Sequence, residues 1–422
     1  MGAITAISQP AGTVTPVTAP DLRPDRAFTP RVLAVFGATA LYFGIAGVSF
    51  PVLPRLVERE LGGSEADIGL AFGVFAIGML LVRPLAGWML DRVGRRPVMV
   101  AGSSALVILQ LLHVPAASTG HLSILLAVRV LTGAASSAMY LSQATVATEL
   151  PPPHHRDRVF ALFSTVVLVG FAVGQVAGES VMQSYGFGWA FALAAGFAGA
   201  SALVAFTLPE TRPDEVVPAA SFTDLFHPAA VRVGVVNLLI FVAFMGFNAF
   251  IADYAEEFGM AEARWILLTY SLTVMAMRAA SGYVLGRFAR IHIATFAHLT
   301  VVAGAVLLST ANSVTQLYLA AVVIAIGLAW NVPLMVLIAV DSATEAQRSR
   351  AVATVTTFGD LANSVGTLVL GLVAETWGYP GMYRMVAVSG VAALLLMRSR
   401  FMATTAGLHR AGGAPVAPSA VR

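Results

Sequence analysis

Runs of about 20 apolar residues recur along almost the whole chain, and no other feature restricts its fold as strongly. Each run is long enough for a helix to cross the ~30 Å hydrocarbon core of a bilayer. The 422 residues are 58% hydrophobic and only 11% charged, whereas a soluble domain carries about 25% charged residues. The composition therefore argues against a soluble enzyme or a nucleic-acid-binding protein and indicates a polytopic membrane protein.

We predict an all-α membrane protein with twelve transmembrane helices. Twelve such spans use roughly 240 residues, so the loops between them must be short. Residues 1–30 are rich in Ala, Thr, Pro and Ser and are predicted to form a disordered tail, as are residues 400–422. The predicted spans are 32–54, 68–90, 97–117, 122–147, 159–182, 187–207, 229–251, 265–286, 292–311, 316–340, 351–375 and 381–399.

The arginines predict how the chain is oriented. All 25 basic residues are arginine. If the N-terminus lies inside, most of them fall in inside loops and tails, which is the bias that sets membrane orientation. We therefore expect both termini to be cytoplasmic and the protein to lie in the cell inner (plasma) membrane. The few arginines assigned to outside loops are Arg55, Arg59, Arg264 and Arg384.

An internal repeat divides the chain into two halves. The pattern of Arg, Gly, aromatic, Leu, Arg and Arg at 83–95 recurs with the same spacing at 278–290. We predict two pseudo-symmetric six-helix bundles, at 31–207 and 229–399, joined by a cytoplasmic linker at 208–228. Two parallel repeats with a substrate site between them near mid-bilayer are a known transporter plan.

Three motifs resemble the major facilitator superfamily. The loop Gly87-Trp-Met-Leu-Asp91-Arg92-Val-Gly94-Arg95-Arg96 is similar to the family's signature between spans 2 and 3. Leu125-x-x-x-Arg129-x-x-x-Gly133 and Pro209-Glu210-Thr211-Arg212 resemble two further elements. The resemblance implies the major facilitator fold, and by general pattern the twelve-span drug and metabolite efflux branch, whose members are proton antiporters.

The signature loop implies a cytoplasmic gate that holds that side of the transporter closed. Glycines permit a tight turn and close approach, and an acid can sit at a helix N-terminus and pair with an arginine. The alternative is that the arginines only set topology. In the second copy Gly286 replaces the acid, so we expect a weaker gate there or none. The predicted gate residues are Gly87, Asp91, Arg92, Gly94 and Arg95.

Three of the charged residues within or at the end of predicted spans are candidates for function. A charge inside the bilayer is costly and marks function by default. Arg129 lies roughly 12 Å deep in span 4 at 1.5 Å per residue, where it could shift the pKa of a nearby carboxylate or bind an anionic substrate group. Asp360 is the one unambiguous mid-membrane acid and is a candidate proton carrier; the alternative is a salt bridge to Arg278 or Arg83. Glu179 is a second candidate proton site, although solvation at the membrane interface is the more common explanation.

Span 5 carries part of an antiporter motif. Drug:proton antiporters of the family have Gly-x8-Gly-x3-Gly-Pro-x2-Gly-Gly. Here Ala161, Gln175 and Glu179 replace the first Gly, the Pro and the last Gly, which weakens the antiporter assignment. Small residues at this spacing let helices pack closely. The glycines expected to pack helices are Gly133, Gly170, Gly174 and Gly178.

Several polar residues are candidates for a central cavity, although each is individually more often a helix-to-helix hydrogen bond. We expect a helix break at Asn331-Val-Pro333 that exposes backbone groups to a ligand. The two histidines at the outer ends of spans 3 and 4 have no carboxylate or Cys in ligand spacing, so no metal is expected. The cavity candidates are Tyr42, Tyr140, Gln143, Asn237, Asn248 and Asn331.

The sequence thus predicts a secondary transporter rather than an enzyme. It contains no Gly-x-x-x-x-Gly-Lys loop for ATP, and we expect no cofactor. We predict a monomer that exports a small organic molecule by proton-coupled alternating access, with the substrate, protons and the lipid bilayer as partners. The alternatives are a proton-coupled importer of a small metabolite and a transport-inactive membrane sensor or scaffold.

Overall fold

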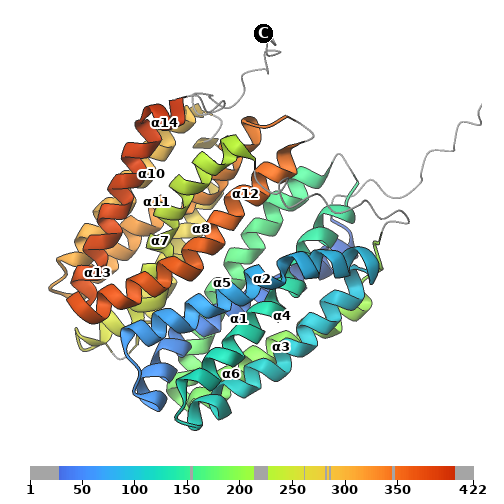
Figure 1. Cartoon of the computed structure of the whole chain (residues 1–422), viewed down its shortest axis with the longest axis horizontal. Coiled ribbons are helices and arrows are strands. Elements are labelled where there is room, and N and C mark those ends of the chain that lie inside the picture. The colour runs from blue at the N-terminus through green and yellow to red at the C-terminus, as the bar shows by residue number, and fades with distance from the viewer. Residues whose placement is uncertain are drawn as a thin grey trace, which may run out of the picture.

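The computed structural model describes residues 28–152, 155–212, 227–260, 262–280, 283–284, 287–344 and 347–403. These residues are almost entirely helical (Figure 1). Most of the predicted tails and of the predicted linker lies outside them, but the expectation of disorder from residue 400 onward is wrong at its start, where residues 400–403 form a short helix. In the first half the helices are α1 (Pro30–Leu61), α2 (Glu65–Arg92), α3 (Arg95–Ser118), α4 (Leu122–Glu149), α5 (Arg156–Tyr185) and α6 (Phe187–Thr207).

The second half repeats this arrangement with one irregular run. Helices α12 and α13 are joined without interruption by a five-residue π-helix, η4. The elements are α7 (Pro228–Glu256), α8 (Arg264–Ala279), α10 (Arg290–Ser309), α11 (Val314–Asp341), α12 (Arg348–Leu361), η4 (Ala362–Gly366), α13 (Thr367–Arg398) and α14 (Arg400–Ala403).

Ten helical runs among the described residues are long and apolar enough to cross a membrane. The all-α membrane fold is therefore confirmed, while the count of twelve is not reached. Helix α8 is described over only 16 residues, because parts of 281–286 lie outside the described ranges. The run from Arg350 to Arg398 counts as one, although Gly378 interrupts it with φ 67° and ψ 175°.

Two groups of helices lie side by side in Figure 1, blue to green for α1–α6 and yellow to red for α7–α14. We call them the first and the second bundle. The most extensive contacts lie within each group, such as α1 with α5 and α10 with α11. Between the bundles, α2 packs on α13 and α5 packs on α8. The two bundles thus meet along a small set of helices.

The helices alternate in direction, so the structure has two ends. We call the end where α2 finishes at Arg92 and α10 starts at Arg290 the arginine-rich end. The end where α1 finishes at Leu61 and α7 finishes at Glu256 is called the acidic end.

Helix α1 is longer than predicted, and this changes the environment of one charge. Two internal prolines do not end it, and it continues to Leu61, where Gly62 adopts a left-handed conformation with φ 60°. The expectation that Arg55 and Arg59 lie in an outside loop is therefore wrong. Arg55 lies inside α1, and its side chain is only 1% exposed.

Glycines bring the helices of the first bundle into backbone contact. A Cβ atom on Gly170 or Gly174 would lie 2.2 Å from a carbonyl oxygen of α1, and one on Gly133 would lie 1.9 Å from the carbonyl oxygen of Phe75 in α2. A Cβ on Gly178 would lie 2.8 Å from Val48. At each of these four glycines the neighbouring helix leaves no room for a Cβ atom.

Candidate functional site

One ion pair connects the two bundles deep in the structure. Arg83 Nη1 of α2 donates to Asp360 Oδ2 of α12 at 2.5 Å. Asp360 lies 12 residues into α12, roughly 18 Å along the helix axis at 1.5 Å per residue. The two side chains are 27% and 16% exposed, so they are shielded but reachable. The salt bridge from Asp360 to Arg83, considered above as the alternative to a proton carrier, is confirmed. The two opposite charges are therefore paired with each other.

The chain is irregular directly after Asp360. The π-helix η4 begins two residues later, at Ala362. Single π-helical turns are rare and are found frequently at functional sites. This irregularity could not be read from the sequence.

Two of the predicted cavity residues lie beside this ion pair. Tyr42 of α1 and Tyr140 of α4 stack with ring centroids 6.0 Å apart. Both interact electrostatically with Asp360 and Arg83. Phe43 packs edge-on against Tyr140 at 5.6 Å. The ion pair is thus bordered by aromatic rings of the first bundle.

A cluster of phenylalanines crosses the bundle interface. Phe50 of α1 lies 5.0 Å from Phe72 of α2, 5.1 Å from Phe171 of α5 and 6.2 Å from Phe244 of α7, measured between ring centroids. We call these four residues the phenylalanine cluster. Sequence analysis did not identify them, because in a chain with 24 phenylalanines nothing distinguishes a ring at the interface from one facing lipid.

Gln175 links the bundles beside the phenylalanine cluster. Its Nε2 donates to Asn248 Oδ1 of α7 at 2.8 Å, and its Oε1 accepts from Ser271 Oγ of α8 at 3.3 Å. The residue that replaces the proline of the antiporter motif is therefore a polar connection between α5 and the second bundle. Asn248, a predicted cavity residue, is one of its partners.

The remaining polar candidates are hydrogen-bonded within single bundles. Gln143 Nε2 donates to the Ala38 carbonyl at 3.1 Å. Asn331 Nδ2 donates to Asn237 Oδ1 at 3.0 Å, and both asparagines are almost fully buried. Helix α11 continues through Pro333, so the expected helix break is wrong. These contacts are the helix-to-helix hydrogen bonds considered as the alternative.

Arg129 lies at the contact between α4 and α2. Its Nε donates to the Ala71 carbonyl at 3.1 Å, and its guanidinium lies 4.6 Å from the ring centre of Phe75 and 5.7 Å from that of Phe72. The side chain is 2% exposed. Cation–π contacts stabilise such a desolvated arginine, and this one orients a member of the phenylalanine cluster.

The predicted gate residues form a network inside the first bundle. Arg95 is 5% exposed; it donates from Nη2 to Glu149 Oε1 at 3.0 Å and from Nη1 to Asp91 Oδ1 at 3.3 Å. Gly94 has φ 115°, which a glycine tolerates. The Glu210 carboxylate accepts from the backbone N–H of Arg95 at 2.8 Å. These bonds connect α2, α3, α4 and the segment after α6.

The second bundle contains a matching ion pair. Arg290 is the first residue of α10, as Arg95 is of α3. It pairs with Asp341, the last residue of α11, whereas Arg95 pairs with the last residue of α4. Gly286 lies outside the described residues, but this pair shows that the second bundle keeps an arginine–carboxylate contact at the same end.

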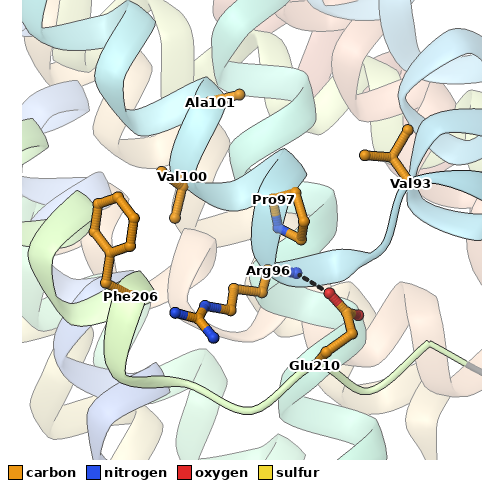
Figure 2. Close-up of a pocket in the computed structure, with 7 residues that line it drawn as sticks. All are labelled: Val93, Arg96, Pro97, Val100, Ala101, Phe206 and Glu210. Carbon is orange, nitrogen blue, oxygen red and sulfur yellow. Dashed lines mark hydrogen bonds between the residues drawn. The ribbon is translucent and has the colours of Figure 1, made fainter.

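Two predicted gate residues, Gly87 and Arg92, have surroundings different from those of Arg95 and Asp91. A Cβ atom on Gly87 would meet nothing within 4 Å, so the close approach expected there is wrong. The Arg92 guanidinium lies 5.3 Å from the Trp88 ring centre. A pocket of about 600 Å³ lies next to this loop (Figure 2), where the backbone N–H of Arg96 donates to Glu210 at 3.1 Å. None of its lining residues belongs to the central ion pair.

At the acidic end, buried charges surround Arg55. Glu179 of α5 is fully buried, so the interpretation that it is solvated at the interface is wrong. Its Oε1 accepts from Arg55 Nη1 at 3.3 Å and from the backbone N–H of Ala263 at 2.8 Å. Arg55 Nε also donates to Glu256 of α7 at 2.6 Å. This arrangement was not predicted from the sequence, because Arg55 lies just beyond the predicted end of the first span.

An all-helical bundle of membrane-spanning length with charged and aromatic residues between two repeated halves defines a polytopic membrane protein of the transporter type. The family model of the Major Facilitator Superfamily matches residues 35–261 and 233–421. The chain therefore belongs to the Major Facilitator Superfamily.

Curated relatives include bacterial multidrug resistance proteins. Multidrug resistance protein MdtL of Klebsiella pneumoniae subsp. pneumoniae is 28% identical over 190 residues, which cover 45% of this chain and 47% of that protein. MdtL of Salmonella paratyphi B is 25% identical over 272 residues, covering 61% and 67%. The first alignment thus spans about half the length of the curated relative.

Solved structures share the fold at low identity. The D-xylose-proton symporter aligns with a TM-score of 0.71 at 16% identity, covering 87% of this chain and 96% of that one. The human organic anion transporter MFSD10 aligns with a TM-score of 0.67 at 21% identity, covering 89% and 100%. At these identities the likeness concerns the fold alone.

Proposed function

We propose that this protein is a secondary transporter that exports a small amphipathic organic molecule by proton-coupled alternating access. In this proposal twelve spans form two six-helix bundles in the inner membrane, with both termini and the arginine-rich end in the cytoplasm. The family membership and the multidrug resistance relatives support export of a drug or metabolite.

The observation that carries the proposal is the Arg83–Asp360 pair between the bundles. A carboxylate and a guanidinium at this depth are costly unless they are paired or used. A substrate or a proton that binds Asp360 competes with Arg83, and so changes one of the described connections between the bundles. This competition is a means of coupling a proton to the movement of a substrate.

The surroundings of the pair support a proposal for the substrate class. Tyr42 and Tyr140 lie on one side, and the phenylalanine cluster adds aromatic rings from both bundles. Aromatic rings bind flat apolar molecules and cations through their faces. We therefore expect aromatic molecules with one basic group to be bound better than sugars or carboxylic acids.

Contacts at the acidic end support the proposal that this end is closed. Arg55 pairs with Glu256 across the two bundles at 2.6 Å, and Arg59 pairs with the same carboxylate at 3.0 Å. Ser64 of the first bundle donates to Glu375 of the second at 3.0 Å. Contacts of this kind hold the acidic end closed, so in this state exchange with solvent occurs from the arginine-rich end.

The test is transport by purified protein in liposomes, with ethidium as the aromatic cation. In the wild type, we expect an imposed pH gradient to drive ethidium movement opposite to the proton flow. Asp360→Asn should abolish this gradient-driven flux, because the amide can no longer exchange a proton. Glu60→Gln is the control, since it removes an exposed carboxylate that lies on α1 of the first bundle, away from α12 in the sequence.

Three results decide between the alternatives. Ethidium movement in the same direction as the protons would indicate an importer. Normal proton-driven flux in Asp360→Asn would remove Asp360 from the mechanism. The absence of pH-driven flux of any tested cation or metabolite in the wild type would contradict the transport proposal and favour a sensor or scaffold.

Orientation is tested separately. The chain contains no cysteine, so single cysteines can be placed without a background. We expect a membrane-impermeant maleimide to label Ser118→Cys in intact cells and Arg212→Cys only after permeabilisation. The reverse result would contradict the proposed orientation.

A further inference from the structure

Three carboxyl groups share one buried arginine at the acidic end. Glu179 of α5 and Asp253 and Glu256 of α7 all lie within ion-pair distance of Arg55, at 3.3, 4.0 and 2.6 Å. We call these four residues the Arg55 cluster. It joins the first bundle to the second, because α1 and α5 belong to one and α7 to the other.

Asp253 differs from the other two acids in this cluster. Glu179 accepts a backbone N–H bond in addition to that from Arg55, and Glu256 is also paired with Arg59. Neither oxygen of Asp253 has a hydrogen-bond donor, although the residue is only 7% exposed. A buried carboxylate without a donor is strongly unfavourable and normally becomes neutral instead.

The charges near Asp253 lead to the same conclusion. Arg59 forms an ion pair with Glu256. Arg264, which lies next to Glu179, forms an ion pair with Glu262 at 2.5 Å. Counted with these partners, three arginines face four carboxylates. Glu58 also faces Asp253, so negative charge exceeds positive charge here, and Asp253 is the member that no described donor stabilises as an anion.

We propose, building on the transport function above, that Asp253 is a proton-binding residue that must be protonated for the acidic end to close. In the closed state the proton neutralises Asp253 and leaves Arg55 to its two other acids. When the bundles separate at this end, water reaches Asp253 and the proton is released to, or taken from, the compartment on that side. The site thus gives protons access from the side opposite to Asp360.

The groups that face Asp253 from the packed helices are consistent with this assignment. They are Arg55, Glu58 and Arg59 on α1, Glu179 on α5, Glu256 on its own helix, and Tyr379 and Tyr383 on α13. The arginines on this list already pair with carboxylates other than Asp253. The tyrosines bring no positive charge. No group on the list therefore replaces the proton.

The test measures the width of the acidic end without any substrate. Spin labels at Ser184→Cys on α5 and Trp265→Cys on α8 report the distance between the bundles in lipid nanodiscs. We expect the ratio of open to closed distances to rise with pH by up to tenfold per pH unit, which is the limit for one linked proton. Asp253→Asn, a neutral isostere, should stay closed and lose this pH dependence.

Glu256→Gln serves as the matched comparison, because it neutralises an acid of the same cluster that is already paired. Glu256→Gln should shift the distances between the spin labels toward the open state at every pH, but these distances should still depend on pH. If Asp253→Asn opens the acidic end at low pH, the residue acts as a charged partner of Arg55 and the inference is wrong. An unchanged pH dependence in Asp253→Asn, or a wild-type distance that does not respond to pH, also overturns it. These experiments measure no transport, so their failure can be distinguished from a failure of the proposed transport function.

Discussion

Replacement of Gly174 by alanine provides a quantitative test of how the first bundle is assembled. The new Cβ would lie 2.2 Å from the Gly44 carbonyl oxygen and 2.8 Å from the Gly44 Cα. Carbon–oxygen contacts between packed helices are normally about 3.3–3.6 Å, so α1 and α5 would have to move apart by roughly 1.1–1.4 Å. Overpacking of this kind costs about 1–3 kcal/mol.

Gly37 is the matched control in α1, because a Cβ atom there meets nothing within 4 Å. Gly37→Ala should be neutral or stabilising by about 0.5–1 kcal/mol, the usual gain from replacing a helical glycine. The assay is unfolding of the purified protein by sodium dodecyl sulfate in mixed micelles, followed by circular dichroism. Gly174→Ala should unfold at a clearly lower detergent fraction. Equal midpoints for the two variants would refute the close packing of α1 on α5.

Two further predictions concern the predicted gate and a hydrogen bond between the bundles. Asp91→Asn should lower ethidium turnover several-fold while equilibrium binding changes little, because a gate affects movement rather than affinity; equal losses in flux and binding would count against a gate. Gln175→Leu removes the hydrogen bond to Asn248 between the bundles. Such bonds contribute about 0.6 kcal/mol and up to about 1.7 kcal/mol in membranes. The open-to-closed ratio of the labels at Ser184→Cys and Trp265→Cys should therefore rise about three- to twentyfold, and an unchanged distance distribution would contradict the role of Gln175.

Part of the candidate site was predictable because its chemistry is local. Asp360 was identified from a single fact, an acid in the middle of an apolar run, and its partner Arg83 was already among the alternatives. Tyr42 and Tyr140 were predicted as cavity candidates because they are polar residues within predicted spans. Gly170, Gly174 and Gly178 followed from their spacing, since residues one or two turns apart share a helix face.

Other parts depended on contacts that no local pattern contains. Arg55 lies 124 residues before Glu179 and 201 before Glu256, and its burial required α1 to continue beyond the apolar run. Asp253 was overlooked because the predicted seventh span stopped two residues before it. The four residues of the phenylalanine cluster come from four helices, so only the packing of those helices distinguishes them from rings that face lipid.

The sequence by itself determined the membrane class, the helical fold and the family. The reason is that the bilayer requires every backbone N–H and C=O group to be bonded within the chain, and this turns apolar length directly into helices. Tertiary structure alone decided which charges are paired and which are not. The energy of a buried charge depends on the atoms within a few ångströms of it, and around Arg55 and Asp253 those atoms belong to helices that are distant in the chain.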